Sequence, residues 1–349
     1  MERRGLLDEK GLKALLEVLI REYRVVAPVP LAGGAYGLTP VLEPDPSTFD
    51  LAGIRPYQPM KSFFLEPRRS VASGFQTRVP DTERRPFCIL GAKACDLAGM
   101  AIQDAVFKSG DFLDPQYVSA RERNLIVTSD CGFAGDTCFC TAMGGAPYAE
   151  KGYDLNISVL SDNWLLEAGS AAGESLMERL EDSLIPAGEE ALKQRELQRS
   201  RVKNEVEEQV RSAGAPDVES LDGVIARAYE SQVWKDEAQR CVECGACNTI
   251  CPTCHCFLLY DQMLESGERM AKLRVWDSCL LKGFARVAGG ANPRPELWMR
   301  LRNRFEKKFD FFPRTEGIHA CTGCGRCVSA CPAEIDIREV LRRLVEDAG

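Results

Sequence analysis

The stretch CVECGACNTICPTCHCF, residues 241–257, decides the fold of the C-terminal half of this chain. Its first part follows the spacing C-x2-C-x2-C-x3-C-P, and CTGCGRCVSACP (321–332) repeats that spacing. Gaps of two residues let the chain curl round one face of a four-iron cubane. Small residues such as Gly245 and Gly323 let backbone N–H groups approach its sulfurs. The repeat therefore predicts two [4Fe–4S] clusters.

The two runs are expected to share their cysteines. In two-cluster ferredoxins the fourth cysteine of each run binds the cluster of the other run. We therefore expect one cluster on Cys241, Cys244, Cys247 and Cys331, and the other on Cys321, Cys324, Cys327 and Cys251. Pro252 and Pro332 then turn the chain away without needing an amide partner. Structural zinc is the alternative, but zinc sites generally use two separated C-x2-C knuckles.

Composition limits the class of protein. The chain has 349 residues, 16 cysteines and a net charge of −8. Its length suits two or three domains, whereas disulfide scaffolds are typical of small secreted chains. Charge interrupts every apolar run of residues 1–26, which favours an amphipathic helix over a signal peptide, and no run is long enough to span a membrane. We therefore expect a cytoplasmic protein without a nucleic-acid partner.

Residues 1–185 are expected to form an α/β domain. RPFCIL (85–90) and NLIVTSD (124–130) have the pattern of strands, and CDLAGMAIQDAVF (95–107) between them has apolar residues at helical spacing. This order predicts a crossover and a parallel pair of strands. NISVL (156–160) and NWLLEAG (163–169) could form a hairpin.

Four cysteines of this half follow the expected strands. Cys95 comes after the first strand, Cys131 after the second, and Cys138 and Cys140 a few residues later. The carboxyl ends of neighbouring parallel strands meet at one edge, so these thiols could converge. They predict a possible third iron–sulfur cluster that residues 1–185 would hold alone. Packed, unliganded cysteine is the alternative, and we prefer it for Cys88 inside its strand.

The segment EEALKQRELQRSRVKNEVEEQV (189–210) is mostly charged and has few apolar positions. It favours an exposed helix or linker whose face is solvated and has no partner. We therefore expect three parts: an α/β domain (1–185), a charged helical linker (186–223) and an α-helical ferredoxin domain (224–349) that binds two [4Fe–4S] clusters.

Three further cysteines lie in the C-terminal half: Cys254, Cys256 and Cys279. With His255 or His319 they could hold another metal or cluster. They could also be a redox pair beside a cluster edge, or only pack. Three thiols alone leave a metal site incomplete, so a structural or redox role is preferred. His255 is expected to be a hydrogen-bonded neighbour rather than a ligand.

Longer stretches resemble known families. The first cysteine block, with a helix entering it, looks like the α-helical ferredoxin of fumarate reductase and heterodisulfide reductase subunits, in which a helical insertion separates the motifs. Several stretches together resemble the β subunit of cytoplasmic NiFe sulfhydrogenases and the corresponding iron–sulfur subunit of anaerobic sulfite reductase: GAKACDLAGMAIQDAVF (91–107), DTCFCTAMGGAP (136–147), CPTCHCF (251–257) and WDSCLLKGFARVAGGANPRP (276–295). The resemblance extends from about residue 85 to the end.

That resemblance implies an iron–sulfur electron carrier. Its expected partners are an FAD-containing subunit that handles NAD(P) and a catalytic subunit of the hydrogenase or of the sulfur, sulfite or heterodisulfide reductase type. The chain has no G-x-G-x-x-G after a strand, and the glycines of LAGGAYG (31–37) have the spacing of a loop. We therefore expect no flavin or nucleotide on this chain.

Three functions compete at this point. An electron relay is preferred. The second is an enzyme that reduces a sulfur or disulfide substrate at Cys254, Cys256 and Cys279, and would turn over such a substrate with an artificial reductant. The third is a redox-sensing module that would lose its binding partner when the clusters are reduced.

Overall fold

The N-terminal half is built on a mixed sheet. The computed structural model describes residues 3–73, 76–77, 85–263 and 270–349. Within them the larger sheet has the strand order β1-β9-β8-β7-β6-β2-β3, in which β8, β7, β6 and β2 are parallel neighbours. Its strands are β1 (Arg4–Leu7), β2 (Arg24–Pro30), β3 (Tyr36–Val41), β6 (Phe87–Ala92), β7 (Leu125–Ser129), β8 (Leu155–Val159) and β9 (Trp164–Ala168).

The predicted crossover and hairpin are confirmed. Strand β6 leads into α3 (Ala94–Phe107) and pairs in parallel with β7, while β8 and β9 pair antiparallel. The helix expected over residues 1–26 is shorter than predicted. It is α1 (Glu9–Glu22), and it begins at Asp8, whose carboxylate accepts a hydrogen bond from the Gly11 N–H at 2.7 Å. Strands β1 and β2 flank it.

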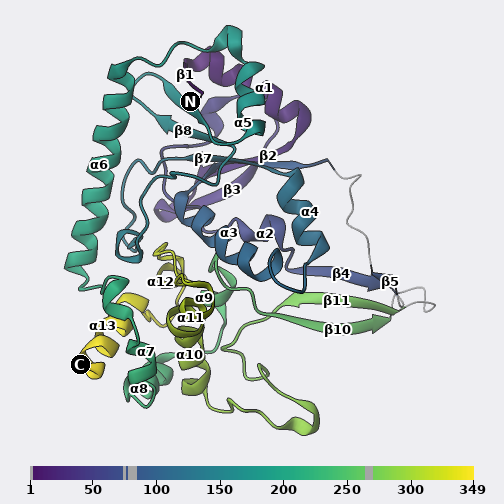
Figure 1. Cartoon of the computed structure of the whole chain (residues 1–349), viewed down its shortest axis with the longest axis vertical. Helices are drawn as coiled ribbons and strands as arrows, with labels where there is room; N and C mark the ends of the chain where they lie inside the picture. Colours follow the sequence, from purple (N-terminus) through teal and green to yellow (C-terminus); the bar gives the residue numbers. More distant parts are fainter. Residues whose placement is uncertain (1–2, 74–75, 78–84, 264–269) are drawn as a thin grey trace.

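Helices cover both faces of this sheet (Figure 1). Helices α1 and α5 (Ala171–Glu178) pack on the face that carries Leu90 and Val127. The other face, which carries Ile89 and Ile126, is covered by three helices: α2 (Lys61–Phe64), α3 and α4 (Pro115–Arg123). Because both faces are buried, the central parallel strands are nearly continuous apolar runs. The carboxyl ends of β6 and β7 are left free for the cysteines that follow them.

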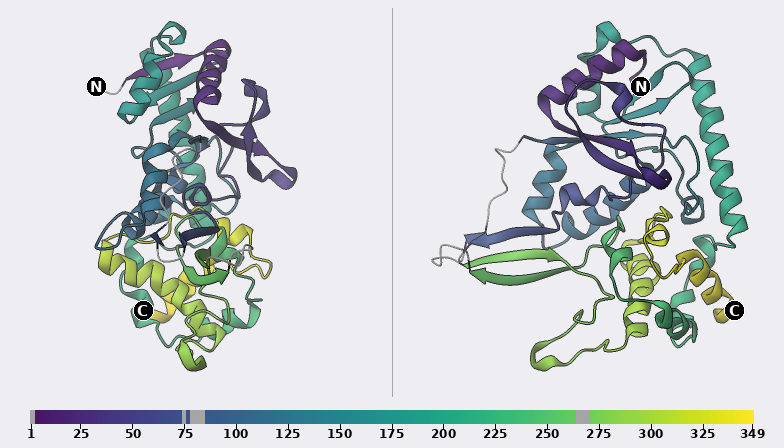
Figure 2. Two further views of the ribbon diagram at one scale, coloured as in Figure 1. Left: turned by 90° about the vertical axis from the view of Figure 1, so that its right-hand side faces the viewer. Right: turned by 180° about the vertical axis from the view of Figure 1, so that it is seen from behind.

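A second sheet joins the two halves of the chain. Strands β4 (Arg68–Ser73) and β5 (Gln76–Thr77) pair with a hairpin of β10 (Phe257–Met263) and β11 (Met270–Trp276), in the order β10-β11-β4-β5. The expectation of a helical insertion between the cysteine blocks is therefore wrong for its first part. The apolar and aromatic residues of β10 and β11 favour strands. Figure 2 shows this sheet projecting from the side of the molecule.

The rest of the C-terminal half is helical, as predicted. Its elements are α7 (Val224–Arg227), α8 (Val233–Arg240), α9 (Ala246–Thr249), α10 (Leu297–Glu306), the π-helical turn η7 (Lys307–Phe311), α11 (Phe312–Glu316), α12 (Arg326–Ser329) and α13 (Ile337–Ala348). Trp234, Phe305 and Leu341 are buried at the centre of its apolar core. The short helices α9 and α12 each lie inside one cysteine run.

Helix α6 (Glu189–Ser212) runs beside the sheet and down to the ferredoxin part (Figure 1). The expectation of a solvated face without a partner is wrong for one side of it. Arg195 forms an ion pair with buried Glu167, and Arg199 approaches Asp130 at 2.8 Å. Val202 and Val206 on the same helix are also buried. Some of the charged side chains that make this segment resemble a linker therefore form ion pairs with residues of the sheet and its loops.

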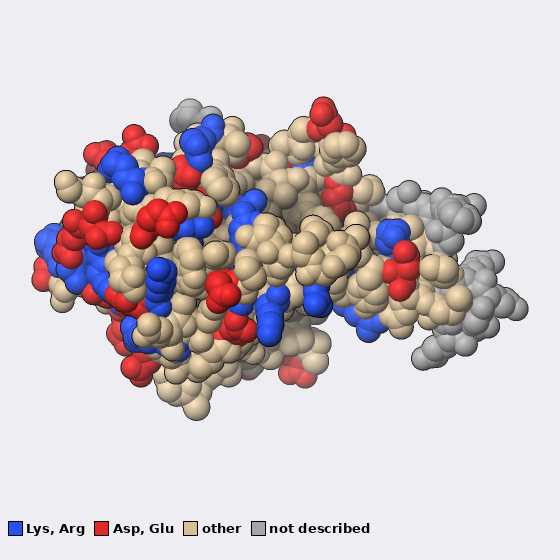
Figure 3. Space-filling view, turned by 90° about the horizontal axis from the view of Figure 1, so that it is seen from below, with Lys and Arg blue, Asp and Glu red and all other residues tan. Residues whose placement is uncertain are grey.

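The surface carries charges of both signs. Acidic and basic side chains are interspersed over the face shown in Figure 3. A binding site for phosphate backbones would need a stripe of Lys and Arg, and this face has none. Among the described helices, no long apolar segment could cross a membrane.

Candidate functional site

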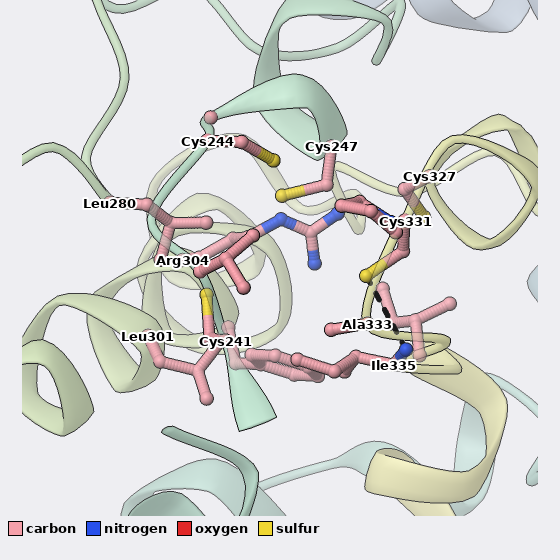
Figure 4. Close-up of a pocket in the computed structure, with 15 residues that line it drawn as sticks. Cys241, Cys244, Cys247, Leu280, Leu301, Arg304, Cys327, Cys331, Ala333 and Ile335 are labelled. Carbon is pink, nitrogen blue, oxygen red and sulfur yellow. Dashed lines mark hydrogen bonds between the residues drawn. The ribbon is translucent and has the colours of Figure 1, made fainter. Parts of the chain in front are cut away.

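The first four predicted ligands lie around one apolar cavity. Cys241 ends α8, Cys247 lies in α9, and Cys331 follows α12, so two distant segments meet there. Figure 4 shows these thiols with Cys244 and Cys327 at the cavity, beside Leu280 and Leu301. The backbone N–H of Ile335 donates to Cys331 Sγ at 3.3 Å. An N–H group aimed at sulfur is the contact that stabilises cluster thiolates.

The second set lies in an adjacent cavity, which is lined by Cys251, Cys321, Cys324 and Cys327. Burial raises the pKa of Cys321 to about 12 and that of Cys327 to about 11. Such thiols are neutral unless a positive partner such as iron compensates the thiolate. The cysteines of each predicted set thus line a common cavity, and Cys327 of the second set also lines the first cavity.

Tight turns hold the second run against the N-terminal half. Gly325 has φ +69°, and a Cβ there would lie 2.0 Å from the Thr137 carbonyl oxygen. A Cβ at Gly323 would lie 2.4 Å from the Phe139 carbonyl oxygen, and the Phe139 N–H donates to Gly323 O at 2.8 Å. Only glycine permits this approach. The loop of residues 138–140, which we call the CFC loop, therefore packs directly on the second cysteine run.

The N-terminal cysteines also converge. Cys95, Cys131, Cys138 and Cys140 line a third cavity at the carboxyl ends of β6 and β7, where the crossover predicts them. Burial raises the pKa of Cys131 to about 11. However, Val206 of α6 and Cys324 of the second run line the same cavity. Residues 1–185 therefore do not enclose this cavity alone, contrary to expectation. Cys88 is fully buried within β6, as predicted.

The remaining cysteines, Cys254, Cys256 and Cys279, line a separate cavity of about 260 Å³. His255 also lines it, but its Nδ1 lies 3.1 Å from the Thr253 carbonyl oxygen, and burial lowers its pKa to about 4. It is a hydrogen-bonded neighbour, as expected. His319 lines a different and larger cavity.

Buried cations near the thiols were missed by the sequence analysis. Lys308 Nζ donates to Cys251 Sγ at 3.3 Å, and Arg304 lines both the first and the second cavity. Lys61 Nζ donates to the Cys254 carbonyl oxygen at 2.8 Å. The sequence contains an indication for two of these cations. Arg304 and Lys308 are four residues apart in a helix and lie on the same side as Leu301 and Phe305, where basic residues are unusual.

The donor set fits iron–sulfur clusters. Each of the first three cavities is lined by at least four thiols, and most of the other side chains at the first and third cavities are apolar. In the part of the chain that the structure describes, no three His, Cys, Asp or Glu side chains converge closely enough to hold a single metal ion. A cluster held at such a cavity accepts and releases single electrons.

Comparison with known proteins agrees with this chemistry. Residues 240–335 match the family described as a 4Fe-4S dicluster domain. The chain is therefore an iron–sulfur protein of electron transport. Over 290 residues it is 33% identical to Sulfhydrogenase 2 subunit beta of Pyrococcus furiosus, a match that covers 82% of this chain and 83% of that protein. It belongs to the family of sulfhydrogenase beta subunits, which confirms the resemblance drawn from its motifs.

Proposed function

We propose that this chain is the electron-relay subunit of a cytoplasmic hydrogenase-type complex. One observation carries the proposal: the three cysteine cavities are in series. Cys327 lines both the first and the second cavity, and Cys324 lines both the second and the third. Clusters at such close sites exchange single electrons directly. The chain then holds two [4Fe–4S] clusters, on the cysteines assigned from the repeat, and a third iron–sulfur cluster on the four N-terminal cysteines.

Both ends of this series lie near the surface. At the first site, Cys244 is exposed, and Val242 and Leu281 beside it are 63% and 40% exposed. At the third site, Cys95 and Cys140 also line an open cavity of about 680 Å³. Each end therefore offers a route for electrons to or from another subunit. This supports two partners, a flavoprotein that oxidises or reduces NAD(P) and a catalytic subunit.

The test is isolation of the native complex under anaerobic conditions, with identification of its subunits and an iron count on this chain. We expect a flavoprotein, a catalytic subunit and more than eight irons per chain, since each four-iron site contributes about four. A chain with about four irons in undegraded protein would contradict the two-motif assignment. About eight irons in the wild type, with the same count in Cys138→Ala, would show that the N-terminal cysteines bind no cluster.

A second candidate is reduction of a sulfur or disulfide substrate on this chain itself. The observation that favours it is the separate cavity of Cys254, Cys256 and Cys279. The isolated, cluster-loaded chain should then turn over such a substrate with an artificial reductant, and Cys256→Ala should abolish the turnover. Absence of turnover in a fully loaded chain would rule out this second candidate.

A further inference from the structure

Two buried cations lie between the cysteine sites. Arg304 of α10 and Lys308 of η7 are each 5% exposed. Lys308 Nζ donates to Cys251 Sγ at 3.3 Å, to Thr253 Oγ1 at 2.6 Å and to the Ala320 carbonyl oxygen at 3.0 Å. Arg304 Nε donates to Asn248 Oδ1 at 3.0 Å. Figure 4 shows the Arg304 guanidinium at the first cavity, among the thiols that line it.

Neither cation has a carboxylate partner within 4.0 Å among the described residues, which sets them apart from their neighbours. Arg300 on the same helix pairs with Glu243, and buried Arg326 approaches Asp96 at 2.7 Å. One terminal nitrogen of Arg304 has no hydrogen-bond partner in the described part of the chain. A buried charge without a counterion is costly. These two side chains therefore need an anion that protein carboxylates do not supply.

The groups that face them are cysteines. Arg304 lines the first and second cavities, and Lys308 lines the second. Both also line the cavity of Cys254, Cys256 and Cys279. An iron–sulfur cluster bound by four thiolates is an anion, and it becomes more negative when it is reduced. A nearby buried cation stabilises the reduced form more than the oxidised form.

We propose that Arg304 and Lys308 are the counterions of the clusters at the first and second sites, and that they raise the reduction potential of the second site above that of the first. Both cations face the second site, whereas only Arg304 faces the first. Of these two sites, the second then holds the electron preferentially. This inference rests on the proposed function, because it requires clusters at both sites.

The test is a redox titration of the full, cluster-loaded chain, followed by visible absorption and electron paramagnetic resonance. Lys308→Met should lower the midpoint potential of the second site by about 59 mV or more. For a one-electron couple, this shift corresponds to a tenfold change in the electron-transfer equilibrium. Arg304→Gln should lower the potentials of both sites. The charge-retaining variants Lys308→Arg and Arg304→Lys should stay near the wild type.

Lys307→Met is the matched control, because Lys307 is the adjacent residue of the same helix but is exposed. It should leave both potentials unchanged. The signal of the second site is identified in a Cys244→Ser background, where the first site is damaged and the Lys308→Met shift should persist.

Unchanged potentials in iron-replete Lys308→Met and Arg304→Gln proteins would overturn the inference. If the charge-retaining variants shift the midpoint potentials as much as the neutral variants do, the inference is also overturned, because the shape of the side chain and not its charge would then set the potential. If the neutral variants lose iron while the charge-retaining ones keep it, charge compensation is supported; loss from all four variants contradicts it. A wild type with too little iron for two clusters would instead refute the proposed function.

Discussion

At the scale of single residues, a thiol's neighbours decide what it can do. Cys88 lies inside β6 among aliphatic side chains, whereas Cys131 follows β7 and lines a cavity with four other thiols. Burial raises the pKa of both, so neither ionises readily without a compensating positive charge. Only Cys131 has neighbours that could share a metal cluster. Chemical identity alone does not distinguish the two positions.

Substituting single ligands tests the assignment of the two runs. Cys244→Ser should remove about four irons, and Cys324→Ser should also remove about four, because each is assigned to a different four-iron site. Cys88→Ala should keep its iron and cost only about 1 kcal/mol of stability. The measurement is iron and inorganic sulfide per chain. Equal iron in Cys244→Ser and wild-type proteins would refute its assignment as a ligand.

At the scale of elements, the molecule is held together by contacts that cross the expected domain boundaries. The CFC loop packs on the second cysteine run, α6 lies against the sheet, and β4 pairs with β11. Two of these contacts depend on groups that tolerate little change. Gly325 lies against the backbone of the CFC loop, and Glu167 forms a buried ion pair with Arg195 of α6.

Gly325→Ala should disrupt the packing of the CFC loop on the second run. The new Cβ would meet the Thr137 carbonyl oxygen at 2.0 Å, so the two segments must separate. We expect loss of iron from the second and third sites, measured as iron per chain and visible absorbance. Gly317→Ala is the control: φ is +71° there, but the new Cβ meets nothing within 4 Å. It should cost only about 1–2 kcal/mol, and equal iron loss in both variants would contradict this account.

Glu167→Gln should destabilise the contact between α6 and the sheet. Glu167 approaches Arg4 at 3.0 Å and Arg199 at 3.3 Å and also pairs with buried Arg195, which would keep only its second partner, Glu196, at 2.6 Å. The expected cost is about 2–3 kcal/mol, as for the loss of charge-assisted hydrogen bonds, measured from denaturant unfolding of the anaerobic, cluster-loaded chain.

The control for this prediction is Glu207→Gln on α6, which breaks only an exposed pair with Lys203 at 3.9 Å. It should cost about 1 kcal/mol or less. Similar costs for the two variants would mean that α6 is held by its apolar residues alone.

At the scale of the whole molecule, the cysteine cavities form a path between two open ends. The first cavity opens beside exposed Cys244, and the third adjoins the large open cavity between the two halves, which Cys321 of the second site also lines. The second cavity shares a cysteine with each of the other two and is lined by both Arg304 and Lys308. This arrangement favours passage of electrons through the chain over chemistry confined to one end.

Nicotinamide nucleotides should not reduce the isolated chain. A hydride carries two electrons, and a flavin on a partner must divide them before single-electron carriers can accept them. Addition of NADH or NADPH to the loaded chain should leave its visible spectrum unchanged until the flavoprotein is added, while dithionite reduces it directly as a control. Rapid reduction by either nucleotide in a flavin-free sample would refute this prediction.

The amino-acid sequence by itself determined the local features. The two cysteine runs, the order β6, α3, β7 and the hairpin β8–β9 all depend on spacings of a few residues, which backbone geometry fixes locally. The sequence also indicated that Cys95, Cys131, Cys138 and Cys140 could meet, because parallel strands end at a common edge.

Only the tertiary structure decided how these local features contact one another. It placed Cys324 at both the second and the third cavity, turned α6 towards the sheet, paired β4 with β11, and put Arg304 and Lys308 beside the thiols. Each of these contacts joins residues far apart in the chain, or depends on which side of a helix faces the interior. Burial, not local propensity, selects such contacts, and burial depends on the packing of the whole chain.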